Sequence, residues 1–195
     1  MNKNSLAGVS ALLLVTGLAA PAQAAVATFD DLPSADGLVP DGYAGINWDG
    51  NWFYYGSAQE PYQPASAPNR IYRNAGKFGN DLAAVPFYFL TDSVFNGAAI
   101  AGYQDAGVRF ELYLDGALVH TTSTFIPTST ATFYASGYSG RVDEVRFTSI
   151  NYITFDDITF AAVPEPASWT MMIGGVGIAG GALRRRRAAV SVRFA

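Results

Sequence analysis

The sequence contains no cysteine and a single histidine, His120. Without cysteine the chain has no thiol nucleophile, no disulfide and no cysteine-ligated zinc or iron–sulfur site. A nucleophilic triad needs a histidine in a cleft beside its nucleophile, and no Gly-x-Ser-x-Gly elbow accompanies His120. We therefore predict a non-enzymatic protein in which His120 lies on a sheet surface.

Positive charge and helical periodicity are also scarce. Residues 25–162 hold six of the 12 basic residues but 15 of the 16 acidic ones, a net charge of −9. Nucleic-acid binding needs a basic surface, so we expect no nucleic-acid partner. No stretch of residues 25–162 repeats apolar residues with the spacing of an amphipathic helix, and none is a phosphate-binding glycine-rich loop.

The first 24 residues have the composition of a secretory signal peptide. Lys3 precedes an apolar run from Leu6 to Ala20, and Ala22-Gln23-Ala24 is a small-x-small cleavage sequence. Cleavage after Ala24 makes Ala25 the first residue of the mature chain. The sequence therefore predicts an exported protein.

Residues 25–162 are expected to form one domain of short strands. Apolar and aromatic segments with period-two alternation recur about every ten residues, separated by glycine, proline and aspartate. Pro86 indicates an edge or bent strand. The pattern predicts an all-β fold, an antiparallel β-sandwich of jelly-roll type. Strands are expected at Ala25–Phe29, Ile46–Tyr55, Leu82–Leu90, Ser93–Tyr103, Val108–Leu114, Ala117–Phe125, Thr130–Ala135, Asp143–Phe147 and Tyr152–Phe160, with an irregular loop from Gly56 to Gly79.

Two Asp-Gly dipeptides predict tight turns. Asp49-Gly50 interrupts an aromatic strand candidate, and Asp115-Gly116 joins two alternating segments into a hairpin. A two-residue loop fixes the hairpin register, in which Glu111 is expected to pair with His120.

The two ends of the domain carry a repeated motif, Thr28-Phe29-Asp30-Asp31 and Thr154-Phe155-Asp156-Asp157. A bulge at Asp156-Asp157 would keep the apolar residues of the last strand on one face. The arrangement resembles galactose-binding-like jelly-roll domains, whose terminal strands lie side by side. That resemblance implies a structural calcium near Asp30, Asp31, Asp156 and Asp157, since calcium prefers oxygen ligands. The alternative is that these aspartates cap turns and bind backbone amides.

Aromatic side chains are concentrated in and just after the second strand candidate. Aromatic rings stack on sugar rings, and the polar group of tyrosine or tryptophan can bind hydroxyls. The alternative is a sandwich core rich in aromatic rings, although Tyr62 and Tyr72 fall in the expected loop. The candidate glycan contacts are Trp48, Trp52, Tyr54, Tyr55, Tyr62 and Tyr72.

The C-terminal segment from Ala167 to Leu183 has no charged side chain and ends at four arginines, Arg184–Arg187. About 17 residues make about 26 Å of helix, the short end of what spans a bilayer. Arginines are costly to move through hydrocarbon, so they favour the cytoplasmic side. The sequence predicts a transmembrane helix at about 167–183, followed by a short tail, 188–195.

Residues 163–187 resemble the PEP-CTERM sorting signal of Gram-negative bacteria, because Pro164-Glu165-Pro166, Trp169 and an arginine cluster occur in that order. The resemblance implies that an exosortase-type enzyme of the inner membrane recognises the proline–glutamate–proline motif during export. Residues 188–195 depart from the family, whose members usually stop soon after the arginines, and the alternative is an ordinary C-terminal membrane helix. The residues implied are Pro164, Glu165, Pro166, Trp169, Arg184, Arg185, Arg186 and Arg187.

Two hypotheses for function follow. The first is an exported, non-enzymatic protein of the cell envelope or extracellular biofilm matrix, anchored at its C-terminus before processing, that interacts with exopolysaccharide. The alternative is a secreted polysaccharide-active hydrolase, which would need two carboxylates placed together in a cleft.

Overall fold

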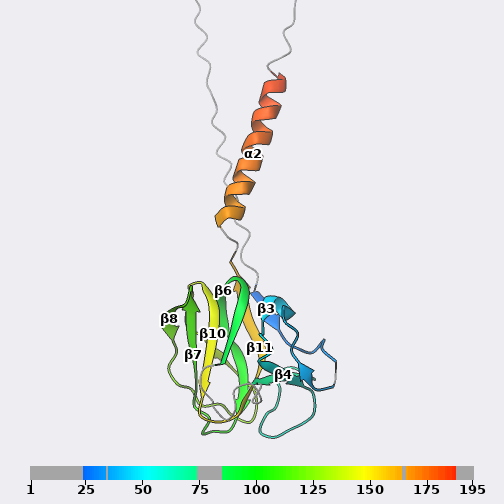
Figure 1. Cartoon of the computed structure of the whole chain (residues 1–195), viewed down its shortest axis with the longest axis vertical. Coiled ribbons are helices and arrows are strands. Elements are labelled where there is room, and N and C mark those ends of the chain that lie inside the picture. Colours follow the sequence, from blue (N-terminus) through cyan, green and yellow to red (C-terminus); the bar gives the residue numbers. More distant parts are fainter. Residues whose placement is uncertain (1–23, 34, 74–84, 164–165, 188–195) are drawn as a thin grey trace, which may run out of the picture. The chain divides into compact units, whose positions relative to one another are not determined.

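The computed structural model describes residues 24–33, 35–73, 85–163 and 166–187. The chain divides into two compact units, of which one runs from Ala22 to Pro166 and the other contains both ends. In the first unit, the described residues form one antiparallel sheet (Figure 1). Its strands are β1 (Ala24–Ala27), β2 (Gly37–Leu38), β3 (Ile46–Asn47), β4 (Trp52–Tyr55), β5 (Arg70–Arg73), β6 (Val85–Gly102), β7 (Val108–Leu114), β8 (Ala117–Thr121), β9 (Thr132–Ala135), β10 (Val142–Ser149) and β11 (Ile153–Ala162).

Two long strands, β6 and β11, connect the parts of this sheet. The strand order is β2-β4-β5-β11-β6-β10-β7-β8, with β1 paired to β11 and with β3 and β9 paired to β6. Figure 1 shows β7, β8 and β10 on one side of β6, and β11 and β4 on the other. The predicted all-β, antiparallel class is confirmed; jelly-roll connectivity stays a prediction.

The core is a set of aromatic rings held between two parts of the sheet. Trp52 on β4 packs edge-on against Phe147 on β10 and Phe155 on β11, with ring centroids 5.6 and 5.4 Å apart. Strands β4 and β10 are not neighbours in the sheet, so these contacts join faces that lie opposite one another. Such packing fits a sandwich, because the sheet curls over its own apolar face.

Both predicted Asp-Gly turns are present. The Asn51 amide donates to the Trp48 carbonyl at 3.0 Å, and both Asp49 and Gly50 have positive φ. Asp115 and Gly116 also have positive φ and connect β7 to β8. Positive φ at both central residues is the geometry of the type I′ turn that such dipeptides favour.

The hairpin register differs from the prediction beyond its first two pairs, Leu114–Ala117 and Tyr113–Leu118. His120 pairs with Leu112 rather than with Glu111, which pairs instead with Thr121. The cause is a register shift between Leu112 and Tyr113, which places an extra residue on β8. The predicted Glu111–His120 pair is therefore wrong.

Two strand boundaries were also wrong. The segments around Pro86 and Ser93 form one continuous strand, β6, in which Pro86 pairs with Arg146 of the neighbouring β10. Pro86 is tolerated there because it is the second residue of the strand. The expected loop from Gly56 to Gly79 contains β5, whose Ile71 is buried opposite Phe155. One apolar residue between Arg70 and Tyr72 was too short a pattern to reveal it.

The first and last strands of the domain lie side by side, as expected. Strand β1 pairs with β11 from Ala24 to Ala27, so the expected signal-cleavage residues Ala24 and Ala25 form its first pairs. The bulge is confirmed too: the register of β11 against β6 shifts after Asp156, and Asp157 has positive φ. Ala22 and the rest of the expected signal peptide lie outside the described residues.

In the other unit, residues Pro166–Arg187 form the helix α2. The expected membrane span at about 167–183 falls inside it and contains Gly174, Gly175 and Gly177, which bring no apolar side chain. Within 24–33, 35–73, 85–163 and 166–187, no helix combines the length and the apolar character needed to cross a membrane. The predicted transmembrane helix stays a prediction.

Candidate functional site

The aromatic residues proposed as glycan contacts separate into two groups. Trp48 and Trp52 are fully buried in the core, and Tyr54 joins them with 7% of its surface exposed. All three belong to the hydrophobic core, and none of them lines the surface pocket described next. The core alternative is correct for them.

The other three tyrosines converge on a surface pocket of about 370 Å³, which we call the tyrosine pocket. Tyr55 comes from β4, Tyr72 from β5 and Tyr62 from the connection between these strands. Tyr152, immediately before β11, supplies a fourth ring. The complete lining is Asp36, Tyr55, Ser57, Gln59, Tyr62, Tyr72, Arg73, Tyr152, Ile153 and Thr154.

Ring contacts fix the tyrosines of the pocket floor. Tyr72 stacks on Phe53 at 5.7 Å between centroids and meets Tyr55 edge-on at 5.2 Å. The guanidinium of Arg70 lies 3.9 Å from the centroid of the Tyr55 ring and donates a hydrogen bond to the carbonyl of Ser57. Because each ring is held by a neighbour, the floor is rigid before any ligand arrives.

One wall of the pocket is the segment 56–69, which we call the covering loop. Asp156 accepts hydrogen bonds from the amides of Ala65 and Ser66 at 2.8 and 2.9 Å. Asp157 accepts one from the Ser66 hydroxyl, and Asp30 accepts one from the Asn69 amide, both at 3.0 Å. The repeated Asp-Asp motif therefore fastens the covering loop to the seam between β1 and β11.

The predicted calcium near the four aspartates stays a prediction, and the contacts of these side chains are with donors of the protein. Asp156 also accepts from the Asp157 amide, and Asp31 accepts from the Tyr43 hydroxyl, so these carboxylates are occupied by donors from the protein. In the part of the chain that the structure describes, no three His, Asp or Glu side chains are grouped as metal ligands. The alternative, that the aspartates bind turns and backbone amides, describes the observed contacts.

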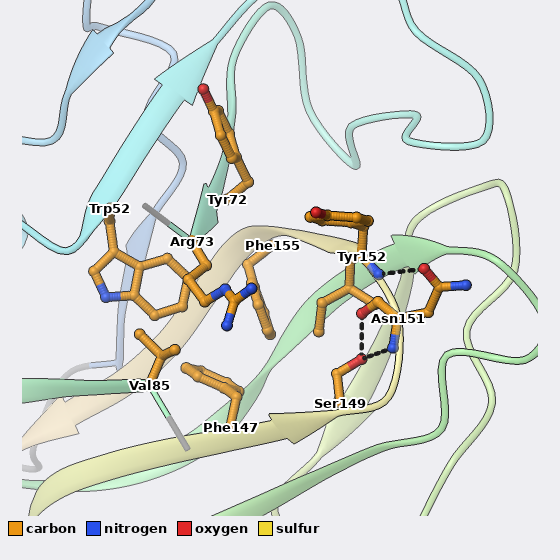
Figure 2. A pocket seen from close by; sticks show the side chains of 10 residues that line it. Trp52, Tyr72, Arg73, Val85, Phe147, Ser149, Asn151, Tyr152 and Phe155 are labelled. Carbon is orange, nitrogen blue, oxygen red and sulfur yellow. Dashed lines mark hydrogen bonds between the residues drawn. The ribbon is translucent and has the colours of Figure 1, made fainter. Parts of the chain in front are cut away.

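A small cavity of about 40 Å³ opens beside the tyrosine pocket and shares Tyr72, Arg73, Tyr152 and Ile153 with it (Figure 2). Its other lining residues are mostly apolar core rings. Figure 2 shows the Arg73 guanidinium directed between Trp52 and Phe155. The cation thus lies toward the apolar inner side of the site.

The turn between β10 and β11 positions Tyr152. The Ser149 hydroxyl donates to the carbonyl of Asn151 at 2.6 Å, and the Asn151 side-chain oxygen accepts from the Tyr152 amide at 2.8 Å (Figure 2). The Asn151 side chain also donates to Asp105 at 3.1 Å. These bonds tie the turn to the loop after β6, so Tyr152 is held although 53% of its surface is exposed.

The hydroxyls of Tyr55, Tyr62 and Tyr72 are neutral at physiological pH. Burial raises the pKa of Tyr62 to about 12. Burial, reinforced by the nearby Asp36 carboxylate, raises the pKa of Tyr72, and burial raises that of Tyr55. A neutral phenol both donates and accepts hydrogen bonds, which is the pattern a sugar hydroxyl requires.

Besides Thr154, which lies in the last strand, sequence reasoning missed four polar members of the pocket, Asp36, Ser57, Gln59 and Arg73. None belongs to a periodic segment or to a recognisable motif, so no local pattern could have identified them. The predicted last strand includes Tyr152, which was not expected in the site; in the structure Tyr152 lies immediately before β11, in the turn that follows β10.

His120 takes no part in the pocket. Its ring stacks on Tyr138 at 5.2 Å, and its Nε2 lies 3.1 Å from the carbonyl oxygen of Ser136. The residue joins β8 to the segment after β9.

The described structure is thus a β-rich domain with a tyrosine-lined pocket, followed in sequence by a helix that ends in arginines. Residues 162–187 match the PEP-CTERM protein-sorting motif, as the sequence predicted. No curated protein and no solved structure matches the chain. The motif identifies an exported protein that an exosortase-type enzyme recognises and sorts to the cell envelope.

The residues of the motif are only partly described. Pro164 and Glu165 lie outside the described residues, whereas Pro166 begins α2, Trp169 lies within it and Arg187 ends it.

Proposed function

We propose that this protein is a non-enzymatic component of the cell envelope or extracellular matrix that binds exopolysaccharide through the tyrosine pocket. The sorting motif supports the destination. The observation that carries the binding is the convergence of Tyr55, Tyr62, Tyr72 and Tyr152 on one open pocket. Before processing, the C-terminal segment meets the inner membrane and the exosortase-type enzyme.

The composition of the pocket suits a carbohydrate. Tyrosine rings offer apolar faces to the C–H side of a sugar and hydroxyls to its rim. Ser57 and Gln59 add donors and acceptors, and the Asp36 carboxylate adds an acceptor for sugar hydroxyls. Deep burial is not needed, since the rings are already fixed by their neighbours and little ordering accompanies binding.

Hydrolysis is less well supported by this site. A glycosidase places two carboxyl groups on opposite sides of the bond that it breaks. Asp36 is the one carboxylate among the described residues that line the tyrosine pocket. A lining with a single acid favours binding over cleavage.

The test is binding of the full-length protein, purified in a detergent without a sugar head group, to exopolysaccharide from its own cells. We expect retention in a pull-down, with Tyr72→Ala weakening it about tenfold, the loss of one stacked ring. Phe133→Ala is the matched control, because Phe133 is an aromatic residue 49% exposed on β9 and outside the pocket. Equal retention of the parent protein and Tyr72→Ala would contradict the site, and release of reducing ends would favour the hydrolase.

A further inference from the structure

The aromatic surface does not end at the tyrosine pocket. Tyr103, in the loop after β6, meets Tyr62 edge-on with centroids 5.8 Å apart. Tyr103 is 49% exposed and Tyr152 is 53% exposed. Tyr103 therefore adds an exposed ring beside a pocket in which Tyr152 is exposed and Tyr55 and Tyr72 are more buried.

Hydrogen bonds order the three connections that carry Tyr103, Tyr152 and Tyr62. The loop of Tyr103 closes through the Ala106 amide, which donates to the Tyr103 carbonyl at 2.9 Å. The Asn151–Asp105 hydrogen bond at 3.1 Å joins this loop to the turn that carries Tyr152. Tyr62 is fixed in the covering loop by its amide, which donates to Gln59 at 2.8 Å. Exposed rings that are fixed before binding lose little entropy on contact with a ligand.

The charges around these rings disfavour an anionic ligand. Asp36 lines the pocket and raises the pKa of Tyr72, while Asp105 stands in the loop of Tyr103 and acts on Tyr62 in the same sense. Residues 25–162 carry a net charge of −9. Arg73 also lines the pocket, but its guanidinium is directed between Trp52 and Phe155, toward the apolar inner side (Figure 2). A uronic-acid chain would therefore meet the like charge of Asp36 at the pocket and that of the whole domain at a distance, whereas a neutral chain would not.

We propose that the tyrosine pocket together with Tyr103 forms one elongated site for a neutral polysaccharide, engaging at least two consecutive sugar units. One unit occupies the pocket floor at Tyr55 and Tyr72. The next stacks on the exposed ring of Tyr103. The inference rests on the proposed function and adds to it the length and the charge of the ligand.

The experiment measures binding of the full-length protein to oligosaccharides of one to six units. The probes are the cello-, laminari-, isomalto- and manno-oligosaccharide series, with oligogalacturonides as the anionic series. We expect affinity for at least one neutral series to rise about tenfold or more from one unit to three, as a second ring is engaged, and to remain lower for oligogalacturonides.

Variants separate the pocket from its extension. Tyr103→Ala should reduce affinity for the longer oligosaccharides about tenfold and leave binding of the single sugar unchanged, because its ring contacts the second unit alone. Phe133→Ala should change neither. Thermal unfolding of each variant, followed by near-UV circular dichroism or by intrinsic fluorescence, checks that the fold is retained.

The outcomes distinguish this inference from the proposed function. Binding that is independent of length, or unaffected by Tyr103→Ala, would overturn the elongated site while leaving a pocket for a single sugar. Tighter binding of oligogalacturonides would overturn the neutral ligand. Absence of binding to all five series and to the cells' own exopolysaccharide would overturn the proposed function itself.

Discussion

Asp156 is a buried carboxyl group whose position links the fold to the pocket. It is 1% exposed and accepts three backbone hydrogen bonds, from Ala65, Ser66 and Asp157. Burial raises its pKa to about 7; the backbone amides lower the pKa and the adjacent Asp157 carboxylate raises it, but burial is the largest effect. A carboxyl group that fastens the covering loop thus changes charge near neutral pH.

The raised pKa predicts how stability depends on pH. In the unfolded chain the pKa of Asp156 returns to about 3.9, so between about pH 4 and pH 7 the folded state binds the proton and the unfolded state does not. The stability that the protonated Asp156 adds to the folded state is therefore fully present below about pH 4 and is lost as pH rises through about 7. It amounts to at most about 4 kcal/mol in the free energy of unfolding.

Urea unfolding of the parent protein and of Asp156→Asn at pH 5 and pH 8 measures this contribution. Asparagine does not titrate, but its amide group would oppose the backbone donors, so we expect the variant to be less stable at both pH values. The difference in unfolding free energy between the two proteins should be smaller at pH 8, because the parent then carries a buried charge. A difference that grows with pH would show that the amides, and not burial, set the pKa.

At the scale of elements, the covering loop depends on one buried side chain near its end. Asn69 is fully buried; its side-chain nitrogen donates to the carbonyls of Phe29 and Leu32 at 2.9 and 3.1 Å. Asn69→Ala leaves these two carbonyls without the donor, which should cost about 2 kcal/mol of unfolding free energy. Because the bonds join the loop to the segment after β1, the loop should open locally more often than the core.

Hydrogen exchange tests this prediction residue by residue. In Asn69→Ala the amides of Tyr62, Ala65 and Ser66, which are bonded in the covering loop or to Asp156, should exchange faster. The amides of the β7–β10 pairing should be unchanged apart from the global loss of stability. As a matched control, Asn47→Ala removes an asparagine side chain that accepts from Asp49 in an exposed turn. Equal protection of the loop in Asn69→Ala and the parent would refute its role.

The elements that sequence predicted are those with a local signature. Asp115-Gly116 predicted a hairpin because both residues accept positive φ. Ile153 and Ile158 are an odd number of residues apart and would lie on opposite faces of a regular strand, which located the bulge at Asp156-Asp157. What local patterns could not show was the extra residue in β8, which moved His120 away from Glu111. Nor could they show which face of an aromatic strand packs into the core and which lines the pocket, so Trp52 and Tyr55 looked alike.

The candidate site was partly predictable for the same reason. Tyr62 and Tyr72 were recognised because they lie in a proline-rich segment where aromatic residues have no expected core to fill. Asp36 and Arg73 were not, since they reach the pocket through the pairing of β2 and β5 with β4, a long-range arrangement that no single segment encodes.

At the scale of the whole molecule, the chain joins an acidic β-domain to a C-terminal sorting motif. Residues 25–162 hold 15 of the 16 acidic residues, and the remaining one is Glu165, in the middle of the proline–glutamate–proline motif. Four arginines follow at the end of α2. The matched motif spans both features, from residue 162 to 187. Sorting is therefore separable from folding, because the motif begins where β11 ends.

Separability predicts the effect of changing Glu165. In Glu165→Ala the domain should fold normally, but the exosortase-type enzyme should no longer recognise the motif, so most of the protein should remain unprocessed and fail to reach the cell surface. Glu60→Ala is a matched control, since Glu60 is also a glutamate followed by proline but lies in the covering loop. Mass spectrometry of surface protein shows both mature termini, and thermal unfolding checks the fold. Surface protein from Glu165→Ala with the same termini as the parent and Glu60→Ala would contradict this prediction. Recognition would then have to depend on Trp169 or on the arginines. Trp169→Ala and a replacement of Arg184–Arg187 by serine would distinguish these two.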